Sequence, residues 1–266
     1  SNLSGSITRG RQIKGIIAEH RKTERKRWAI MSDKRMKEAE QDRDILWKEL
    51  EGAFPFVKKL PAEEKEQLFH QVQVRRFSKG EMVHQGENGC TGVMALKEGR
   101  IKTYIFSPKG KEMTLFRLLS GDVCILSASC MMNNIVFDIH VATEEESCLL
   151  IINSEYFEGL TRKYPEAEKF RNDIIAMRFS EVMWLVEQVM FKRMDQRIAG
   201  FLAEMVNITG SDTVELSHQE IADNLGTARE VVSRLLKYME GEGLVTISRK
   251  EIQVLNLNRL EELAME

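Results

Sequence analysis

The segment 217–241 constrains the fold of this chain more than any other, because it contains two helix-start signals on either side of one glycine. Residues 217–220 (SHQE) form a capping box, in which a serine side chain and a glutamate three residues later satisfy each other's backbone N–H groups. Residues 227–230 (TARE) repeat that pattern directly after Gly226. Glycine adopts the positive φ that a tight turn between helices requires. The segment therefore predicts two short helices joined by a tight turn.

The two predicted helices carry residues suited to packing against each other and against a DNA groove. Ala222 is small enough for a close helix approach, and Val232 and Leu235 would hold the second helix against the first. The opposite side of the second helix is polar. A recognition helix needs such an apolar back and polar front. We predict that this front reads DNA bases through Arg229, Glu230, Ser233, Arg234 and Lys237.

A β-hairpin is predicted after the second helix, over 243–247 and 253–255, as a wing with residues 248–250 at its tip. Segment 192–266 has nine Lys and Arg against thirteen Asp and Glu, so it lacks the overall basic charge typical of a DNA-binding domain. Its cations are instead concentrated where a duplex would lie. Ser248, Arg249 and Lys250 at the tip of the wing are predicted to lie near backbone phosphates, and Ser217 and Thr227 are also predicted to bind DNA.

The middle of the chain follows a different sequence pattern. Short β-type runs alternate with turns at glycines near 80, 86, 99, 110 and 121. This spacing is typical of short strands in an antiparallel roll or sandwich. The runs are 93–96, 101–106, 113–118, 137–142 and 148–152.

A long helix is predicted from Pro165, because proline suits a first helical turn and no further Gly or Pro follows before Gly200. Apolar residues step along it by 4, 3, 4 and 3, as in the seam of a two-helix coiled coil. We interpret this seam as a dimer contact. The alternative, burial against the chain's own sensor domain, explains the width of the apolar surface but not its regularity. The seam residues are Ile175, Phe179, Val182, Val186 and Val189.

Together, the roll, the long helix and the QEIA…GTAREVVSRLL sequence at 219–236 resemble the Crp/Fnr superfamily of bacterial transcription regulators. The resemblance implies an α+β fold: an N-terminal antiparallel, jelly-roll-like sensor, a dimerisation helix and a C-terminal winged helix-turn-helix. It also implies a homodimer, a palindromic DNA operator, an effector pocket between roll and long helix, RNA polymerase as a partner, and no enzymatic activity. Ser233 beside Arg234 resembles the oxygen-sensing branch with its TTGAT-like half-site. Arg229 resembles the cyclic-AMP branch with its TGTGA-like half-site.

Four segments follow from this organisation. Residues 1–44 form a charged arm, which we interpret as solvated, non-native or disordered rather than as a DNA-gripping tail. Residues 45–164 form the roll, 165–191 the dimerisation helix and 192–266 the DNA-binding domain. The sequence contains no run of eighteen apolar residues and no secretory signal, so we expect a cytoplasmic protein.

The effector is the least defined part of the sequence analysis. Cyclic-nucleotide-binding members of the superfamily hold the phosphate with a Gly-Glu pair and an Arg-Ser pair. Here residues 121–130 read GDVCILSASC, the Arg-Ser position is Phe137-Asp138, and no Lys or Arg occurs from Leu118 to Thr161. These departures argue against cyclic AMP, because a buried phosphate without a cation is costly. We expect instead an uncharged pocket for a small apolar effector, or for none, lined by Leu126, Ser127, Ser129, Met131 and Phe137.

The cysteines and histidines of the sequence bear on other sensing chemistries and functions. The oxygen sensors' N-terminal cysteine cluster is missing, since no cysteine precedes Cys90, so no iron–sulfur centre is expected. We interpret the four cysteines as small buried residues. A redox pair of Cys124 and Cys130, or a haem bound through His140, remain as alternatives. His84 and His140 are too isolated for a metal-dependent cupin enzyme. A ligand-binding roll that has lost DNA binding is the other alternative.

Overall fold

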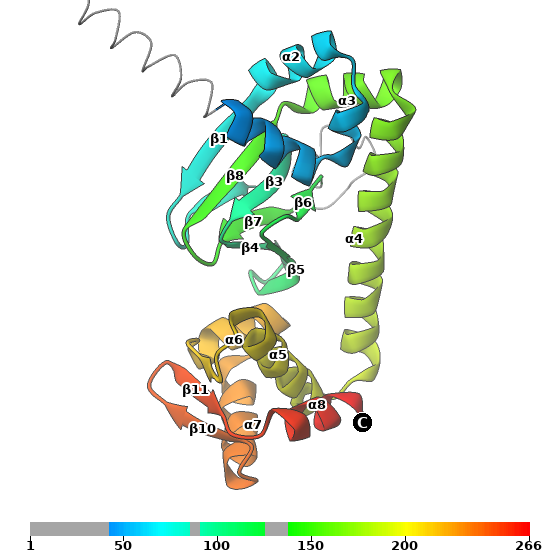
Figure 1. Ribbon diagram of the computed structural model, residues 1–266. Helices are drawn as coiled ribbons and strands as arrows, with labels where there is room; N and C mark the ends of the chain where they lie inside the picture. The colour runs from blue at the N-terminus through cyan, green and yellow to red at the C-terminus, as the bar shows by residue number, and fades with distance from the viewer. Residues whose placement is uncertain (1–42, 86–90, 126–137) are drawn as a thin grey trace, which may run out of the picture. The chain divides into compact units, whose positions relative to one another are not determined.

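The computed structural model describes residues 43–85, 91–125 and 138–266. One compact unit begins at Ala53 and runs to the C-terminus. This boundary lies after residue 52, whereas the sequence analysis ended the charged arm at residue 44. The elements of this unit are labelled in Figure 1.

The first part of the unit is a roll of two antiparallel four-stranded sheets, with strand orders β1-β8-β3-β6 and β2-β7-β4-β5. A 3₁₀ helix η1 (Pro55–Lys59) and helix α2 (Ala62–Gln71) precede it. Its strands are β1 (Val72–Phe77), β2 (Met82–Gln85), β3 (Val93–Glu98), β4 (Arg100–Phe106), β5 (Glu112–Leu119), β6 (Val123–Cys124), β7 (His140–Thr143) and β8 (Ser147–Ile152). The antiparallel roll expected from the glycine spacing is therefore confirmed.

Alternating side chains of the strands form the core of the roll. Along β5, Phe116 and Leu118 are buried in the roll core, whereas Arg117 between them lies on the other face. The inward residues pack with Met94, Ile101 and Val141 from neighbouring strands. Because successive strand residues point to opposite sheet faces, this alternation leaves Arg117 outside the core, available to the elements that follow the roll.

Two helices follow the roll, α3 (Ser154–Lys163) and α4 (Pro165–Phe191). Asn153 caps α3 by accepting a hydrogen bond from the Tyr156 N–H, and Pro165 occupies the first turn of α4. Glu64 of α2 accepts hydrogen bonds from Tyr156, Lys163 and Tyr164, and so ties α2 to this junction. The start of the long helix is thus fixed on the roll by local capping and by one buried carboxylate.

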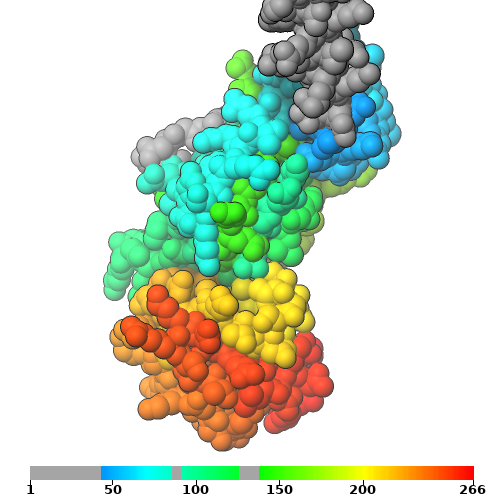
Figure 2. Space-filling model, turned by 60° about the vertical axis from the view of Figure 1, so that its left-hand side comes forward, coloured from blue at the N-terminus to red at the C-terminus, as the bar shows by residue number. Residues whose placement is uncertain are grey.

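The C-terminal part is a winged helix-turn-helix with its own core. Its helices are α5 (Met194–Thr209), α6 (His218–Leu225), α7 (Arg229–Gly241) and α8 (Leu257–Met265). The predicted hairpin is present as β10 (Val245–Ser248) and β11 (Glu251–Val254), and a third strand, β9 (Thr213–Val214), adds to it. The core includes Leu202, Ile221, Val232, Leu236 and Leu260, all fully buried. In the space-filling view these segments, yellow to red, form one continuous mass (Figure 2).

Within the described ranges, no helix combines the length and the apolar character needed to cross a lipid bilayer.

The turn between β3 and β4 gives a test of the roll. Gly99 has φ +97°, and a Cβ there would lie 2.4 Å from the Glu146 carbonyl oxygen, whereas Gly110 has φ +74° and open space around it. Gly110→Ala should cost about 1–2 kcal/mol of stability from backbone strain alone. Gly99→Ala should cost roughly 3 kcal/mol or more, because backbone must move as well. Urea unfolding of both variants measures the difference, and equal losses would contradict the close approach at Gly99.

Candidate nucleic-acid interface

The first helix of the helix-turn-helix begins as the sequence predicts. The Ser217 Oγ accepts a hydrogen bond from the Glu220 N–H at 3.2 Å, and the Ser217 N–H donates to the Glu220 carboxylate at 2.7 Å. The capping box at 217–220 is therefore confirmed. Ser217, predicted to bind DNA, has its hydroxyl engaged in this cap.

The turn after α6 corrects the second half of the prediction. Gly226 has φ +66° and ends α6, as expected, but the N-cap of α7 is Ala228 and makes no side-chain hydrogen bond. The predicted second capping box at 227–230 is wrong. The Thr227 N–H closes α6 by donating to the Ala222 carbonyl at 2.9 Å, so Thr227 belongs to the end of one helix and cannot begin the next. Glu230 is consequently released from a capping role.

Helix α7 has the two-sided character that the sequence indicates. Val232, Leu236 and Met239 are fully buried in the winged-helix core. The opposite side exposes four of the five residues predicted to read bases: Arg229, Glu230, Arg234 and Lys237.

The fifth residue, Ser233, is half-buried and its Oγ is hydrogen-bonded to the His218 Nδ1 at 2.8 Å. This bond joins the first turn of α6 to the middle of α7. Burial lowers the pKa of His218, and the positive charge of Arg229 lowers it further. The sequence assigned Ser233 to base reading, but the structure shows it linking the two helices.

The tip of the wing is a two-residue loop, since Ser248 pairs with Glu251 across the hairpin. Arg249 and Lys250 occupy this loop and are both exposed. Lys250 has φ +63°, the left-handed conformation that short hairpin loops demand. The wing thus presents two adjacent cations at its end, as the sequence predicts.

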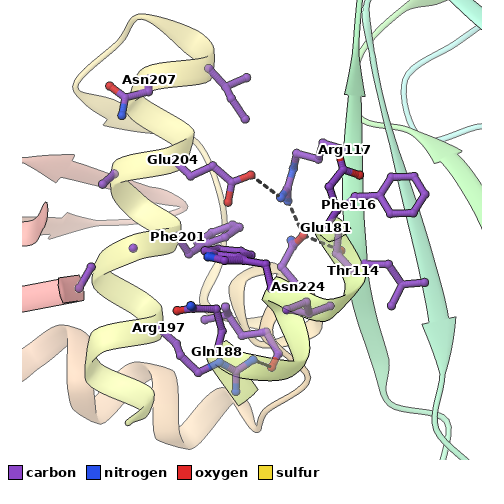
Figure 3. Close-up of a pocket in the computed structure, with 18 of the residues that line it drawn as sticks. Thr114, Phe116, Arg117, Glu181, Gln188, Arg197, Phe201, Glu204, Asn207 and Asn224 are labelled. Carbon is purple, nitrogen blue, oxygen red and sulfur yellow. Dashed lines mark hydrogen bonds and ion pairs between the residues drawn. The ribbon is translucent and has the colours of Figure 1, made fainter. Parts of the chain in front are cut away.

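A buried polar contact joins α6 to the roll, and we call it the Arg117 junction. Arg117, on the outer face of β5, donates to Glu144 at 3.0 Å and to Glu204 of α5 at 3.4 Å. It also donates to the Asn224 Oδ1 of α6, which accepts a further hydrogen bond from the Thr114 hydroxyl at 2.8 Å. Figure 3 shows Arg117 between Glu204 and Asn224. This contact was not predicted from the sequence, because no local pattern signals a pairing of residues 107 positions apart.

A cavity of about 1160 Å³ adjoins the Arg117 junction. Strand β5 and helices α4, α5, α6 and α8 all contribute to its wall. Figure 3 shows Arg197, Phe201 and Gln188 among the side chains that line it. It therefore brings together side chains from the roll, the long helix and the winged helix.

All five residues predicted to line the effector pocket, Leu126, Ser127, Ser129, Met131 and Phe137, lie outside the described residues, as do Cys90 and Cys130. In helix α4, Arg178 is 3% exposed. It donates to the Val123 carbonyl at 3.0 Å and lies over the Phe116 ring. No Lys or Arg occurs between Leu118 and Thr161, and this buried cation on the facing helix was therefore not predicted.

The two histidines and two described cysteines of the roll are packed among neighbouring residues. His84 is buried and hydrogen-bonded to the Thr91 hydroxyl at 2.8 Å, while His140 stacks on Tyr104. Cys124 and Cys148 are both buried. No group of three His, Cys, Asp or Glu suited to a metal ion occurs in the described part of the chain.

The five residues of the dimer seam predicted on α4 differ in their exposure. Val182 is half-buried and packs against the roll core, on the same side as Arg178. Ile175 is also half-buried, whereas Phe179, Val186 and Val189 are exposed. Another row of residues, each of them exposed, steps along the helix by 4, 3, 4, 3 and 4. We call it the α4 stripe, and it consists of Asn172, Ala176, Phe179, Met183, Val186 and Met190.

The roll, the long helix and the winged helix-turn-helix together define a class of proteins, the transcription regulators that couple a sensor domain to DNA binding. The matches to known protein families agree. Residues 74–164 match the cyclic nucleotide-binding domain, and residues 196–263 match the Crp-like helix-turn-helix domain.

Individual relatives lead to the same class. A crystal structure described as that of a Crp/Fnr-family transcriptional regulator from Eubacterium rectale ATCC 33656 is 39% identical, with a TM-score of 0.78, over 80% of this chain and 99% of that one. The transcriptional regulatory protein btr of Bordetella pertussis is 24% identical over 77% of this chain and 86% of its own. The cyclic AMP receptor protein of Thermus thermophilus is 26% identical over 79% of this chain and 96% of its own. The chain belongs to the Crp/Fnr family and is a DNA-binding transcriptional regulator.

The contact between His218 and Ser233 predicts a pH dependence of stability. The pKa of His218 is lowered in the folded protein, so below about pH 6.5 the unfolded chain binds the proton first and the folded state loses stability. His218→Asn keeps a hydrogen-bonding side chain but cannot titrate. Its melting temperature should fall less than that of the wild type between about pH 7.5 and about pH 5.5. His84, whose pKa is also lowered by burial, is present in both proteins and cancels in the comparison. Identical falls would contradict the assignment to His218.

Proposed function

We propose that this regulator binds a palindromic operator as a homodimer and reads each half-site with the exposed face of α7. The observation that carries the proposal is the exposure of Arg229, Glu230 and Arg234 on a helix whose opposite face is locked into the winged-helix core. Such a helix can enter a major groove without rearranging its own domain. The alternative of a roll that has lost DNA binding finds no support in this geometry.

Base reading is assigned to Arg234 and Glu230, which lie one helical turn apart. A guanidinium can bridge O6 and N7 of guanine, and a carboxylate can accept from the N4 amine of cytosine. Neither side chain makes a hydrogen bond or ion pair with any described residue, so both are available. We favour a TTGA-type half-site, with half-site centres about 10–11 bp apart. Ser233, engaged with His218, supports the position of α7 instead.

Arg234 and Lys250 give a matched test of this assignment. Arg234→Ala should cost about 1–3 kcal/mol on the cognate site and much less on a site changed at the guanine. Lys250→Asn should weaken both sites equally and reduce the salt slope by about one, because it removes a phosphate contact. Asparagine is chosen because it tolerates the left-handed backbone of Lys250 better than alanine does. Gel shifts at several salt concentrations measure both variants. If Arg234→Ala weakens both sites alike, Arg234 contacts phosphate and the register of α7 on DNA is different.

Dimerisation is assigned to the α4 stripe. Phe179 is 65% exposed, Met183 47% and Met190 69%, a large apolar surface along one side of a single helix. Burying such a row against its symmetry mate removes apolar area from water on both helices, and the steps of 4 and 3 suit a two-helix coiled coil. The side of α4 that carries Arg178 and Val182 is already occupied by the roll. The stripe is therefore the face left for a second copy.

Changing the stripe should change the oligomeric state. Phe179→Glu combined with Met183→Glu would bury four charges in the dimer contact, and we expect monomers by multi-angle light scattering. Met177→Glu is the matched control. Met177 is 40% exposed but lies on another side of α4, so that variant should remain dimeric. Dimers of the double variant would place the contact elsewhere.

Control by an effector between the roll and α4 is the third part of the proposal. The sequence alone suggested that a phosphate-bearing effector would find no positive partner in this region. Arg178 supplies a buried cation there. Both oxygens of Glu181 already pair with Arg178 at 2.8 Å, which leaves little uncompensated charge. The departures from the Gly-Glu and Arg-Ser pairs still argue against cyclic AMP.

A further inference from the structure

The cavity beside the Arg117 junction differs from the effector region between the roll and α4, because much of its wall comes from the DNA-binding domain. Asn224 and Leu225 of α6, and Arg197 and Phe201 of α5, line it together with Trp184 of α4. Its volume of about 1160 Å³ is ample for a small organic molecule. What could bind there follows from the charges and the apolar surfaces of the wall.

Most carboxylates around the cavity are already engaged. Glu204 pairs with Arg117, Glu181 pairs with Arg178, and Asp122 accepts a hydrogen bond from the Leu119 N–H. Glu261 of α8 also lines the cavity, without a hydrogen bond or ion pair to any described residue. Arginines therefore neutralise two of the four acidic side chains that line the cavity, Glu204 and Glu181, whereas Asp122 and Glu261 keep their charge.

Two cations on the wall are not engaged in this way. Arg197 is half-buried and donates one hydrogen bond, to the Leu225 carbonyl at 2.8 Å, with no carboxylate partner among the described residues. Burial also lowers the pKa of its guanidinium. Lys192, also half-buried, makes no ion pair with a described residue. Such cations are stabilised when an anion supplies the missing charge.

The rest of the lining is apolar and aromatic. Phe201 is 5% exposed, and Trp184, 59% exposed, also lines the cavity. Leu185, Leu225 and Ile208 extend this apolar surface. An exposed indole is costly in water and provides a flat face on which a planar group can stack.

We propose that this cavity is a second effector site, which binds a small aromatic carboxylate with its charged group on Arg197 and Lys192 and its ring against Trp184. The carboxylate would use guanidinium N–H groups that the Leu225 carbonyl leaves free. The ring would cover apolar surface that is now exposed. The site requires β5, α5 and α6 in the arrangement that the Arg117 junction holds, together with the wall that α4 contributes.

Occupancy of the site would favour DNA binding. The helices of the wall are joined by the ligand, so a ligand that binds this arrangement shifts the population toward it. In this arrangement Arg229, Glu230 and Arg234 of α7 are exposed. The bound ligand therefore stabilises a state whose recognition face is free, and should raise affinity for the operator.

Binding can be tested without DNA on the full chain. Benzoate, phenylacetate and 3-phenylpropionate, each compared with its neutral amide, are titrated to millimolar concentration while thermal unfolding is followed. We expect at least one carboxylate, and not its amide, to raise the melting temperature, because a ligand of the folded state stabilises it by mass action. Arg197→Gln should weaken that carboxylate about tenfold, the loss of one charge-assisted contact. Arg193→Gln, an exposed arginine at the start of the same helix, should leave binding unchanged.

Tryptophan fluorescence locates the ligand. The chain has three tryptophans, of which Trp184 lines the cavity. The active carboxylate should alter the emission of the wild type, and Trp184→Phe should abolish that change while keeping the rise in melting temperature. The proposal is overturned if no carboxylate stabilises the protein, if the amides act equally, or if Arg197→Gln binds as the wild type does.

The coupling to DNA rests on the proposed function and is measured separately. The active carboxylate should lower the Kd for a TTGA-type palindrome in the wild type and not in Arg197→Gln. Unchanged or weakened DNA affinity in the presence of bound ligand overturns the coupling. A protein that binds the carboxylate but no DNA at all would instead count against the proposed operator, so the two failures are distinguishable.

Discussion

The contact made by Arg117 is the constraint on which the arrangement of the sensor and DNA-binding parts depends. Its side chain is only 7% exposed, and it reaches Glu144 of the roll, Glu204 of α5 and Asn224 of α6. Removing a guanidinium from water is costly unless its donors are satisfied, so this residue specifies one mutual placement of three elements. Asn224 completes the contact, because its amide group also donates to the Glu220 carbonyl within α6. The helix that supports α7 is thereby linked to a strand of the sensor.

Three different sides of helix α4 face different surroundings. One side carries Arg178 and Val182 and packs against the roll. A second side carries Glu181, Trp184 and Gln188 and lines the cavity next to the winged helix. The third side is the exposed α4 stripe. A helix with functional surfaces in three directions cannot show one clean apolar face, and this explains why its sequence is apolar over so wide an arc.

Some parts of this architecture could be predicted because their signals are local. The capping box at 217–220 and the glycine at 226 involve residues within a few turns of each other, and both appear as expected. The second capping box, predicted at 227–230 from equally local signals, does not form. The Thr227 N–H was required to close α6, and one residue cannot end one helix and begin another. Local signals that overlap compete, and only the folded chain shows which is satisfied.

The seam on α4 illustrates the same limit on a larger scale. Valine, phenylalanine and methionine at heptad spacing predicted a partner helix, and two registers of that spacing fit the sequence. In the folded chain Val182, of the first register, is half-buried against the roll core, whereas every residue of the α4 stripe is exposed. The choice between them depends on a surface that is distant in sequence.

The sequence by itself determined the order of the parts, the roll and the winged helix-turn-helix, the ends of α6 and the polar face of α7, because these follow from periodicity, capping and turn chemistry over a few residues. Only the tertiary structure decided the partners of Arg117, the burial of Arg178 and the cavity lined by Arg197 and Trp184. These depend on segments as far apart as 107 residues. A charged side chain carries no local mark of whether it will meet water, a carboxylate or a cavity, and its energy depends on which of these it meets.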